Sequence, residues 1–362
     1  MNARKPEGTL RKGWTTGACA TAAAIAAFEA LHGEGFSDPV TISLPGGQSP
    51  SFTLVRREMG ENWAEASVIK DAGDDPDITH GAEIITHVEH GEPGKGLQFR
   101  AGEGVGTVTL PGLPLGVGEP AINPGPRRIM SDNLAVLAEK HGVTLDFNIT
   151  VSIPGGEELA LKTMNGRLGI VGGLSVLGTT GIVVPYSCAS WIHSIHRGID
   201  VARATGVLHI SAATGSTSEA AVKQMLGLPD TALIDMGDFA GGLLKYLRAH
   251  PIPRLTLAGG FGKLSKLAQG HMDLHSSRSS VDMLDLAETA RRVGADEAAA
   301  GNIATANTAM QALEIAVEND VPLADAIAGR ARGAALATLA GGTAVEVLIF
   351  TRSGALAGRA GS

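Results

Sequence analysis

After residue 165 the chain alternates short apolar strands with helical patterns, and this alternation constrains the fold more than any other feature. Strands joined by helices indicate right-handed βαβ crossovers and therefore a mostly parallel, Rossmann-like sheet flanked by helices. The predicted strands are VLHIS (207–211), ALIDMG (232–237), RLTLAGG (254–260) and AVEVLIFT (344–351, at the sheet edge), and the predicted helices cover 186–204, 217–227, 238–249, 281–294, 297–318 and 322–339. We therefore assign residues 166–362 to an α/β domain.

The first half of the chain is typical of an α+β domain, over residues 1–165. GWTTGACATAAAIAAFEALHG (13–33) predicts an Ala-rich helix with Thr15 or Thr16 as its N-cap. Hairpins are expected over 40–55 and 147–163, strands at 63–71, 82–90 and 97–104, and a helix at 129–142. TISLPGG (41–47) resembles TVSIPGG (150–156), which suggests an internally duplicated unit.

Composition excludes several classes of protein. Two cysteines make no disulfide framework, and a reducing, cytoplasmic compartment is expected. The N-terminus lacks the apolar segment of a signal peptide, and no apolar run is long enough to span a membrane. The net charge of −8 argues against a nucleic-acid partner. It leaves room for a local basic pocket that takes an acidic small molecule.

The glycine-rich stretch GIVGGLSVLGTTG (169–181) is the candidate cofactor site. A glycine turn after a buried strand lets backbone N–H groups approach a nucleotide or the carboxylate of S-adenosylmethionine. The residues concerned are Gly172, Gly173, Gly178, Thr179, Thr180 and Gly181. Their spacing matches neither GxGxxG nor a Walker A loop, and a sheet-edge turn with packing glycines explains the stretch equally well.

Cationic and amide side chains form a second group of candidates. LAGGFGKLSKLAQGHMDLHSSRS (257–279) carries Lys263, Lys266, His271, His275 and Arg278 after three glycines, which suits a polyanionic ligand. His271 and His275 have the spacing of some zinc ligands, but no third ligand accompanies them. Asn123 and Arg127 in PAINPGPRR, and Arg167 in NGRLG, are candidates for holding carboxylates. Solvated cations and turn-capping amides are the alternative for each.

The helix predicted at 13–33 has no acidic residue in its first turn, so its backbone N–H groups are expected to be open to an anion. Cys19 and Cys188 are expected to be small packing residues.

Four aspartates, Asp71, Asp74, Asp75 and Asp77, crowd the turn DAGDDPDITHG (71–81). The spacing does not match a calcium loop. Two close carboxylates raise one pKa and so favour acid–base chemistry, whereas turn capping by Asp74 or Asp77 requires no function.

Several long motifs occur together and in a fixed order: RKGWTTGACATAAA, VIKDAGDDPDITHGA, GEGVGTVTLPGL, PAINPGPRRIM, VSIPGGEELALKTMNGRLGIVGGLSVLGTTGIVVPYS and GKLSKLAQG. Over residues 9–285 the chain resembles the cobalt-precorrin-5B C1-methyltransferases of cobalamin biosynthesis. The resemblance implies methyl transfer from S-adenosylmethionine to C1 of cobalt-precorrin-5B, giving cobalt-precorrin-6A. Cobalt arrives inside the polycarboxylate tetrapyrrole, so no protein metal site is expected.

With this resemblance, the first domain is expected to supply a substrate cleft and the second to bind the methyl donor at the glycine turn. Substrate contacts are expected from Thr15, Thr16, Asn123, Arg127, Arg167, Lys263 and His275, and Asp74 or Asp75 would adjust a ring proton or oppose the sulfonium charge. Other enzymes of the pathway would hand over the unstable substrate. A nicotinamide-dependent oxidoreductase and a non-catalytic corrinoid carrier are the alternatives.

Overall fold

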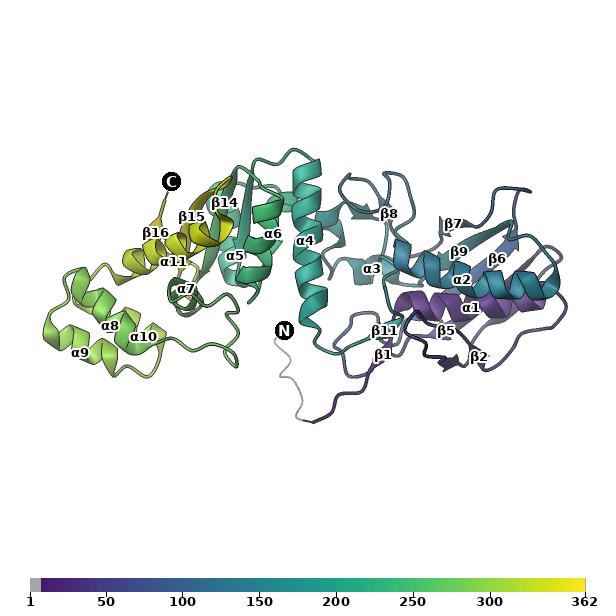
Figure 1. The fold of residues 1–362 in the computed structure, drawn as a ribbon, viewed down its shortest axis with the longest axis horizontal. Helices are drawn as coiled ribbons and strands as arrows, with labels where there is room; N and C mark the ends of the chain where they lie inside the picture. Colours follow the sequence, from purple (N-terminus) through teal and green to yellow (C-terminus); the bar gives the residue numbers. More distant parts are fainter. Residues whose placement is uncertain (1–7, 362) are drawn as a thin grey trace. The chain divides into compact units, whose positions relative to one another are not determined.

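The computed structural model describes residues 8–361, which form two compact units that divide between Ser187 and Cys188 (Figure 1). The sequence placed the boundary between residues 165 and 166. Residues 166–187 belong to the first unit because they pair with its strands: β10 (Ile170–Val171) with β8 (Thr107–Val108), and β11 (Ile182–Val183) with β1 (Gly13–Trp14). The predicted glycine turn therefore lies in the first unit, outside the parallel sheet.

The first unit is built around helix α1 (Thr16–Leu31) and a five-stranded sheet. Nearly every residue of α1 is buried, because its alanines let neighbouring elements approach it on all sides. The sheet has the order β4-β5-β6-β9-β7, with only β7 and β9 parallel. The remaining elements are β2 (Val40–Thr41), β3 (Ser51–Phe52), β4 (Arg57–Met59), β5 (Trp63–Ile69), β6 (Glu83–His90), β7 (Gln98–Ala101), α2 (Pro124–His141), β9 (Phe147–Ser152), α3 (Gly156–Ala160) and η1 (Asn165–Leu168).

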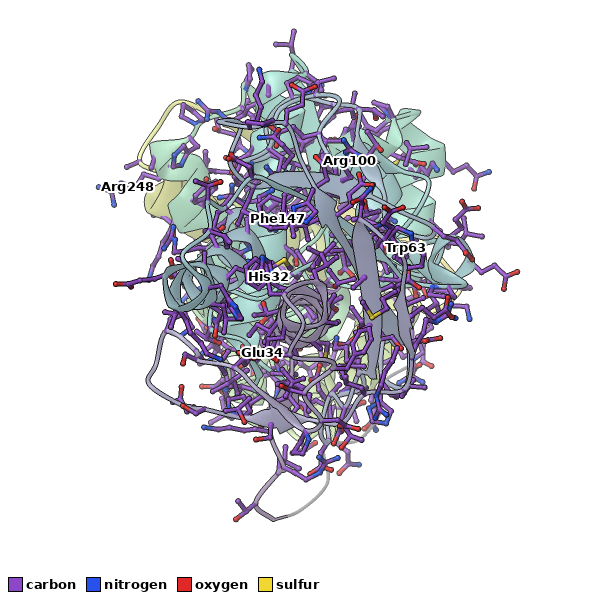
Figure 2. All side chains as sticks on the ribbon, turned by 90° about the vertical axis from the view of Figure 1, so that its right-hand side faces the viewer. His32, Glu34, Trp63, Arg100, Phe147 and Arg248 are labelled. Carbon is purple, nitrogen blue, oxygen red and sulfur yellow. The ribbon has the colours of Figure 1, made fainter. Side chains whose placement is uncertain are left out.

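Aromatic rings close the core at the carboxyl end of α1. Phe28 stacks on His32 with ring centroids 4.2 Å apart and meets Phe147 edge-on at 5.1 Å. Figure 2 shows His32 and Phe147 on this side of the unit. With few aromatic residues in the chain, these rings cap one end of a mostly aliphatic core.

Three predictions for the first unit were wrong. The second hairpin is a strand followed by a helix, because Gly155 takes a left-handed turn (φ 73°) and α3 begins with two glutamates, which favour a helix N-terminus. TISLPGG and TVSIPGG consequently lie in different sheets, which removes the case for a duplicated unit. Helix α2 begins at Pro124 instead of residue 129, since proline is well suited to the first helical position.

The second unit contains the predicted parallel sheet, in the order β13-β12-β14-β15-β16. Strands β13, β12, β14 and β15 are parallel, and β16 joins antiparallel at the edge. Its elements are α4 (Cys188–Ala204), β12 (His209–Ala213), α5 (Ser216–Leu226), η2 (Asp230–Ala232), β13 (Leu233–Asp235), α6 (Ala240–Ala249), β14 (Arg254–Gly260), α7 (Phe261–Ala268), α8 (Met283–Arg292), α9 (Glu297–Ala304), α10 (Ala309–Glu318), α11 (Leu323–Leu339), β15 (Ala344–Phe350) and β16 (Leu356–Ala360).

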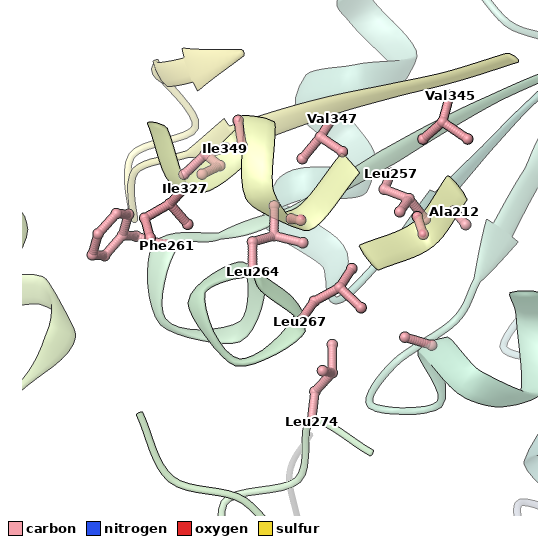
Figure 3. Close-up of a cluster of buried hydrophobic side chains, with 14 of the residues drawn as sticks. Ala212, Leu257, Phe261, Leu264, Leu267, Leu274, Ile327, Val345, Val347 and Ile349 are labelled. Carbon is pink, nitrogen blue, oxygen red and sulfur yellow. The ribbon is translucent and has the colours of Figure 1, made fainter. Parts of the chain in front are cut away.

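Helices cover both faces of this sheet. Ala212, Leu257 and Val347 point into the core formed with α4, α6, α7 and α11 (Figure 3). Their neighbours Ala213, Ala258 and Leu348 point to the other face, where α5 packs. This alternation explains why the strands are apolar throughout.

Two predictions for the second unit also need correction. The strand at 344–351 is internal, because β16 follows it and takes the edge. The helix predicted over 297–318 is two helices, since Thr308 caps the second one by accepting a hydrogen bond from the Gln311 N–H.

The close packing of Gly173 yields a stability prediction. A Cβ at Gly173 would lie 2.3 Å from the Gly104 carbonyl oxygen, whereas one at Gly166 would meet nothing within 4 Å. We expect Gly173→Ala to lower the free energy of unfolding of the first unit by about 2 kcal/mol, measured by urea denaturation. The Gly166→Ala control should change it by less than about 0.5 kcal/mol. Equal effects would contradict the packing role.

Candidate functional site

The aspartate-rich turn between β5 and β6 is held by contacts within the chain. The Arg11 guanidinium hydrogen-bonds Asp71 (Nη2–Oδ1 2.8 Å) and, with the Gly73 N–H, lowers the pKa of Asp71 to about 2. Asp74 Oδ2 accepts the Arg11 N–H at 2.6 Å. Asp75 Oδ1 accepts the Tyr186 N–H at 2.8 Å. Both proposed catalytic carboxylates thus bind the backbone of distant segments.

The fourth aspartate forms a buried ion pair. Asp77 Oδ2 lies 2.5 Å from the Nζ of Lys70, whose side chain is only 3% exposed. Burial opposes the ionisation of Asp77, but the Lys70 ammonium and hydrogen bonds from Lys70 and Thr79 outweigh it, so its pKa lies below the ordinary value. Asp77 Oδ1 also accepts hydrogen bonds from the N–H and hydroxyl of Thr79.

The turn therefore joins three segments: the strand that leads into α1, the sheet, and residues 184–187. Contact is so close that a Cβ on Gly13 would lie 2.0 Å from the Ala72 carbonyl carbon. Turn capping and segment tethering account for all four carboxylates. Over residues 8–361 no cluster of three or more His, Cys, Asp or Glu side chains has the geometry of a metal site.

The N-termini of α1 and α2 meet on the segment 176–179. Thr15 caps α1 by accepting the Ala18 N–H, and the Gly17 N–H donates to the Leu177 carbonyl. The Asn123 N–H, at the start of α2, donates to the Val176 carbonyl. The expectation that the first turn of α1 is wholly open to an anion is thus wrong, because its own chain takes two of these N–H groups.

This meeting point brings together residues from separate motifs. A Cβ on Gly125 would lie 3.0 Å from Thr179 Cα, and one on Gly178 would lie 2.2 Å from Thr15 Oγ1. Neither helix has an acidic residue in its first turn. The positive ends of two helix dipoles therefore face exposed residues Thr179 and Thr180, and the structure gathers Thr15, Thr16, Asn123, Gly178 and Thr179 there.

The two candidate arginines of the first unit have partners within the chain. Arg127 Nε donates to the Ile122 carbonyl at 2.7 Å, its Nη2 pairs with Glu119 Oε2 at 2.8 Å, and its guanidinium lies over the Phe99 ring. It stiffens the loop before α2. Arg167 lies in η1 and also has an interaction partner.

Lys263 and His275 belong to the carboxyl edge of the parallel sheet. Lys263 Nζ donates to the Thr214 carbonyl at 2.7 Å and lies 3.1 Å from Asp238 Oδ1. The Leu274 N–H donates to the Asp238 carbonyl, which places His275 beside this pair. His271 and His275 follow the end of α7 and share no helix face, while Lys266 is buried and donates to the Leu274 carbonyl.

Sequence reasoning missed Thr214, Asp238 and Trp191, which all lie near the same edge. The strand predicted at 207–211 ends two residues before β12 does, so the turn ATGS (213–216) was not recognised as the strand's carboxyl end. Trp191 is 46% exposed, and its Nε1 donates to the Asp235 carbonyl at the end of β13. An exposed tryptophan in a chain with so few aromatic residues was the available signal.

Comparison with known sequences places the chain in a family. The profile of a family described as CbiD matches residues 3–185, and that of the CbiD C-terminal domain matches residues 273–361. A cobalt-precorrin-5B C(1)-methyltransferase of Paramagnetospirillum magneticum is 60% identical over 98% of this chain and 99% of that protein. The chain belongs to the CbiD family.

Two further curated relatives agree with this assignment. Proteins of the same name from Methylorubrum extorquens and Brucella anthropi are 55% identical over 96% and 99% of this chain, and over 97% and 98% of their own lengths. A crystal structure of a cobalamin biosynthesis protein (cbiD) from Archaeoglobus fulgidus is 27% identical, covers 75% of this chain and 84% of that chain, and has a TM-score of 0.40. Within residues 8–361 of this CbiD chain, no helix has the length and apolarity that crossing a membrane requires.

The buried Lys70–Asp77 pair predicts a specific stability loss. Asp77→Asn leaves the Lys70 ammonium buried without its counterion, so we expect the free energy of unfolding at pH 7 to fall by about 3 kcal/mol in urea denaturation. The double variant Lys70→Met with Asp77→Asn should recover most of the loss.

The same pair predicts a pH dependence. The pKa of Asp77 is lower in the folded protein than its ordinary value of 3.8. The stabilisation of the fold by ionised Asp77 is therefore complete above pH 3.8 and is lost as the pH falls through the pKa of the folded protein. The difference in free energy of unfolding between the wild type and Asp77→Asn should shrink over that pH range. A constant difference down to pH 2 would rule out the ion pair as its source.

Proposed function

We propose that this chain transfers a methyl group from S-adenosylmethionine to C1 of cobalt-precorrin-5B, giving cobalt-precorrin-6A. The observation that carries the proposal is the near-complete alignment, at 60% and 55% identity, with proteins that bear this activity in their names. Coverage is almost full on both sides, so the resemblance includes both units.

The chain's own chemistry agrees with methyl transfer between two small molecules. When bound, S-adenosylmethionine supplies a methyl group already activated by a sulfonium, so the protein needs no nucleophile of its own. Cys19 is buried, and burial raises the pKa of its thiol to about 12, which leaves it as a packing residue. The work left to the protein is positioning the two reactants and excluding water.

Substrate recognition is best supported at the N-termini of α1 and α2. A corrin precursor carries many carboxylates, and two helix ends without acidic residues provide a favourable potential for one of them. Thr179, Thr180 and Asn123 offer polar groups at the same place, and Arg128, the fifth residue of α2, adds an exposed cation. In this proposal Asp74 and Asp75 support the site by tethering its segments.

The reaction is tested by incubating the protein with cobalt-precorrin-5B and S-adenosylmethionine carrying an isotopically labelled methyl group. We expect the tetrapyrrole to gain one labelled methyl group, detected by mass spectrometry. Tetrapyrrole binding without methylation would favour a carrier, and NADH-dependent reduction of the tetrapyrrole would favour an oxidoreductase. Either result would overturn the proposal.

A negative charge at the helix ends tests the substrate site. Thr179→Glu should weaken tetrapyrrole binding about fivefold, since the added carboxylate repels those of the substrate. The same charge should raise the stability of the first unit by a few tenths of a kcal/mol through the helix dipoles. Weaker tetrapyrrole binding together with higher stability would indicate a recognition site, because structural damage would lower both the affinity and the stability.

Ala135→Glu is the matched control, because it adds the same charge on the exposed face of α2, three turns from the N-terminus. Binding is measured by calorimetry and stability by urea denaturation. If both variants weaken binding equally, the helix ends are not the recognition site.

A further inference from the structure

The parallel sheet has a topological switch point between β12 and β14. The chain leaves β12 for α5, which packs on one face of the sheet, and leaves β14 for α7, which packs on the other. Connections that depart to opposite faces leave the carboxyl ends of the two strands uncovered between them. Open α/β sheets bind their ligands at such a point.

The groups at this edge favour a carboxylate. Gly215 and Gly260 are the N-cap residues of α5 and α7, and neither helix has a side-chain cap. A Cβ at either glycine would meet nothing within 4 Å, so a ligand can approach the backbone closely. Lys263 adds an ammonium in the first turn of α7, and its bond to the Thr214 carbonyl holds it over the end of β12.

Asp238 supplies an acceptor at the same edge. It follows β13, so its contact with Lys263 reaches across the end of β12, which lies between β13 and β14. Asp238 Oδ1 is buried yet accepts no hydrogen bond, because the 3.1 Å approach of Lys263 lacks hydrogen-bond geometry. A buried carboxylate oxygen without a donor is costly, and a ligand hydroxyl would satisfy it.

An aromatic surface completes the arrangement. The Trp191 side chain is fixed by its bond to the Asp235 carbonyl, and its ring lies 3.3 Å from the position of a Cβ on Gly237. Phe239 lies 6.4 Å away from it, centroid to centroid. Gly237 thus gives the indole room beside the loop that carries Asp238. An exposed, immobilised indole is a stacking platform for a nucleobase.

We propose that this edge binds the methyl donor, S-adenosylmethionine: adenine stacks on Trp191, the ribose hydroxyls donate to Asp238, and the amino-acid carboxylate meets Lys263 and the N-terminus of α7. The assignment rests on the proposed function. It replaces the glycine stretch 172–181, in which Gly173, Gly178 and Gly181 pack against the first unit's own backbone and side chains. The donor set fits the ligand because the adenine, the ribose hydroxyls and the amino-acid carboxylate each have a complementary group in the second unit.

Fluorescence provides the first test. The chain has three tryptophans, Trp14, Trp63 and Trp191. Titration of the full-length protein with S-adenosylmethionine should quench emission in the wild type and in Trp14→Phe and Trp63→Phe, but not in Trp191→Phe. By calorimetry Trp191→Ala should raise the dissociation constant about tenfold. Unchanged quenching in Trp191→Phe, or no quenching in the wild type, would overturn the site.

Ligand truncation provides the second test. Decarboxylated S-adenosylmethionine should bind the wild type about tenfold more weakly than the intact donor, because it lacks the carboxylate. In Lys263→Met the difference between the two ligands should shrink to the part that the N-terminus of α7 supplies, whereas Lys223→Met, which removes a lysine paired with Asp230 elsewhere in the unit, should keep the wild-type difference. Equal weakening of both ligands by Lys263→Met would contradict carboxylate recognition.

Methyl transfer is followed separately with labelled donor. A protein that methylates the tetrapyrrole but fails both binding tests keeps the proposed function and loses this site. A protein that passes the binding tests but does not methylate keeps the site and loses the function. The two proposals therefore fail independently.

Discussion

Within each unit, some backbone segments lie so close together that only glycine, which has no side-chain carbon, fits between them. A Cβ on Gly13 would lie less than 3 Å from the backbone of Ala72. The same is true of Gly173 with Gly104 and of Gly358 with Ala324. Helix α1 achieves similar proximity with alanines. This constraint explains part of the high glycine content, and other glycines supply left-handed backbone turns.

Close approach also decides which polar groups remain for ligands. Backbone groups that meet at such distances bond each other, as the Gly17 N–H does with the Leu177 carbonyl. The aspartates of the turn and Arg127 are used in the same way, as supports for loops that have few apolar side chains to hold them. At the N-terminus of α1 the chain itself takes two of the N–H groups, whereas at the carboxyl edge of the parallel sheet Asp238 Oδ1 accepts no hydrogen bond.

These two places have complementary chemistry. The helix ends of the first unit favour anions and lie beside short hydroxyl side chains, as a polycarboxylate substrate requires. The sheet edge of the second unit combines an indole, a carboxylate and an ammonium, as a nucleoside joined to an amino acid requires. In the two proposals each unit thus offers a site for one reactant, and the distinction follows from their different architectures.

The sequence by itself determined the parallel sheet of the second half, most of its helices and the family, because apolar periodicity and long ordered motifs are local properties. It did not determine where the glycine stretch packs: pairing of β10 with β8 and of β11 with β1 depends on partners far away in the chain. The same holds for Asp74 and Asp75, whose roles depend on Arg11 and Tyr186, and for Asp238, which meets Lys263 only through strand order. Tertiary structure decided these roles because a side chain's chemistry depends on its neighbours in space.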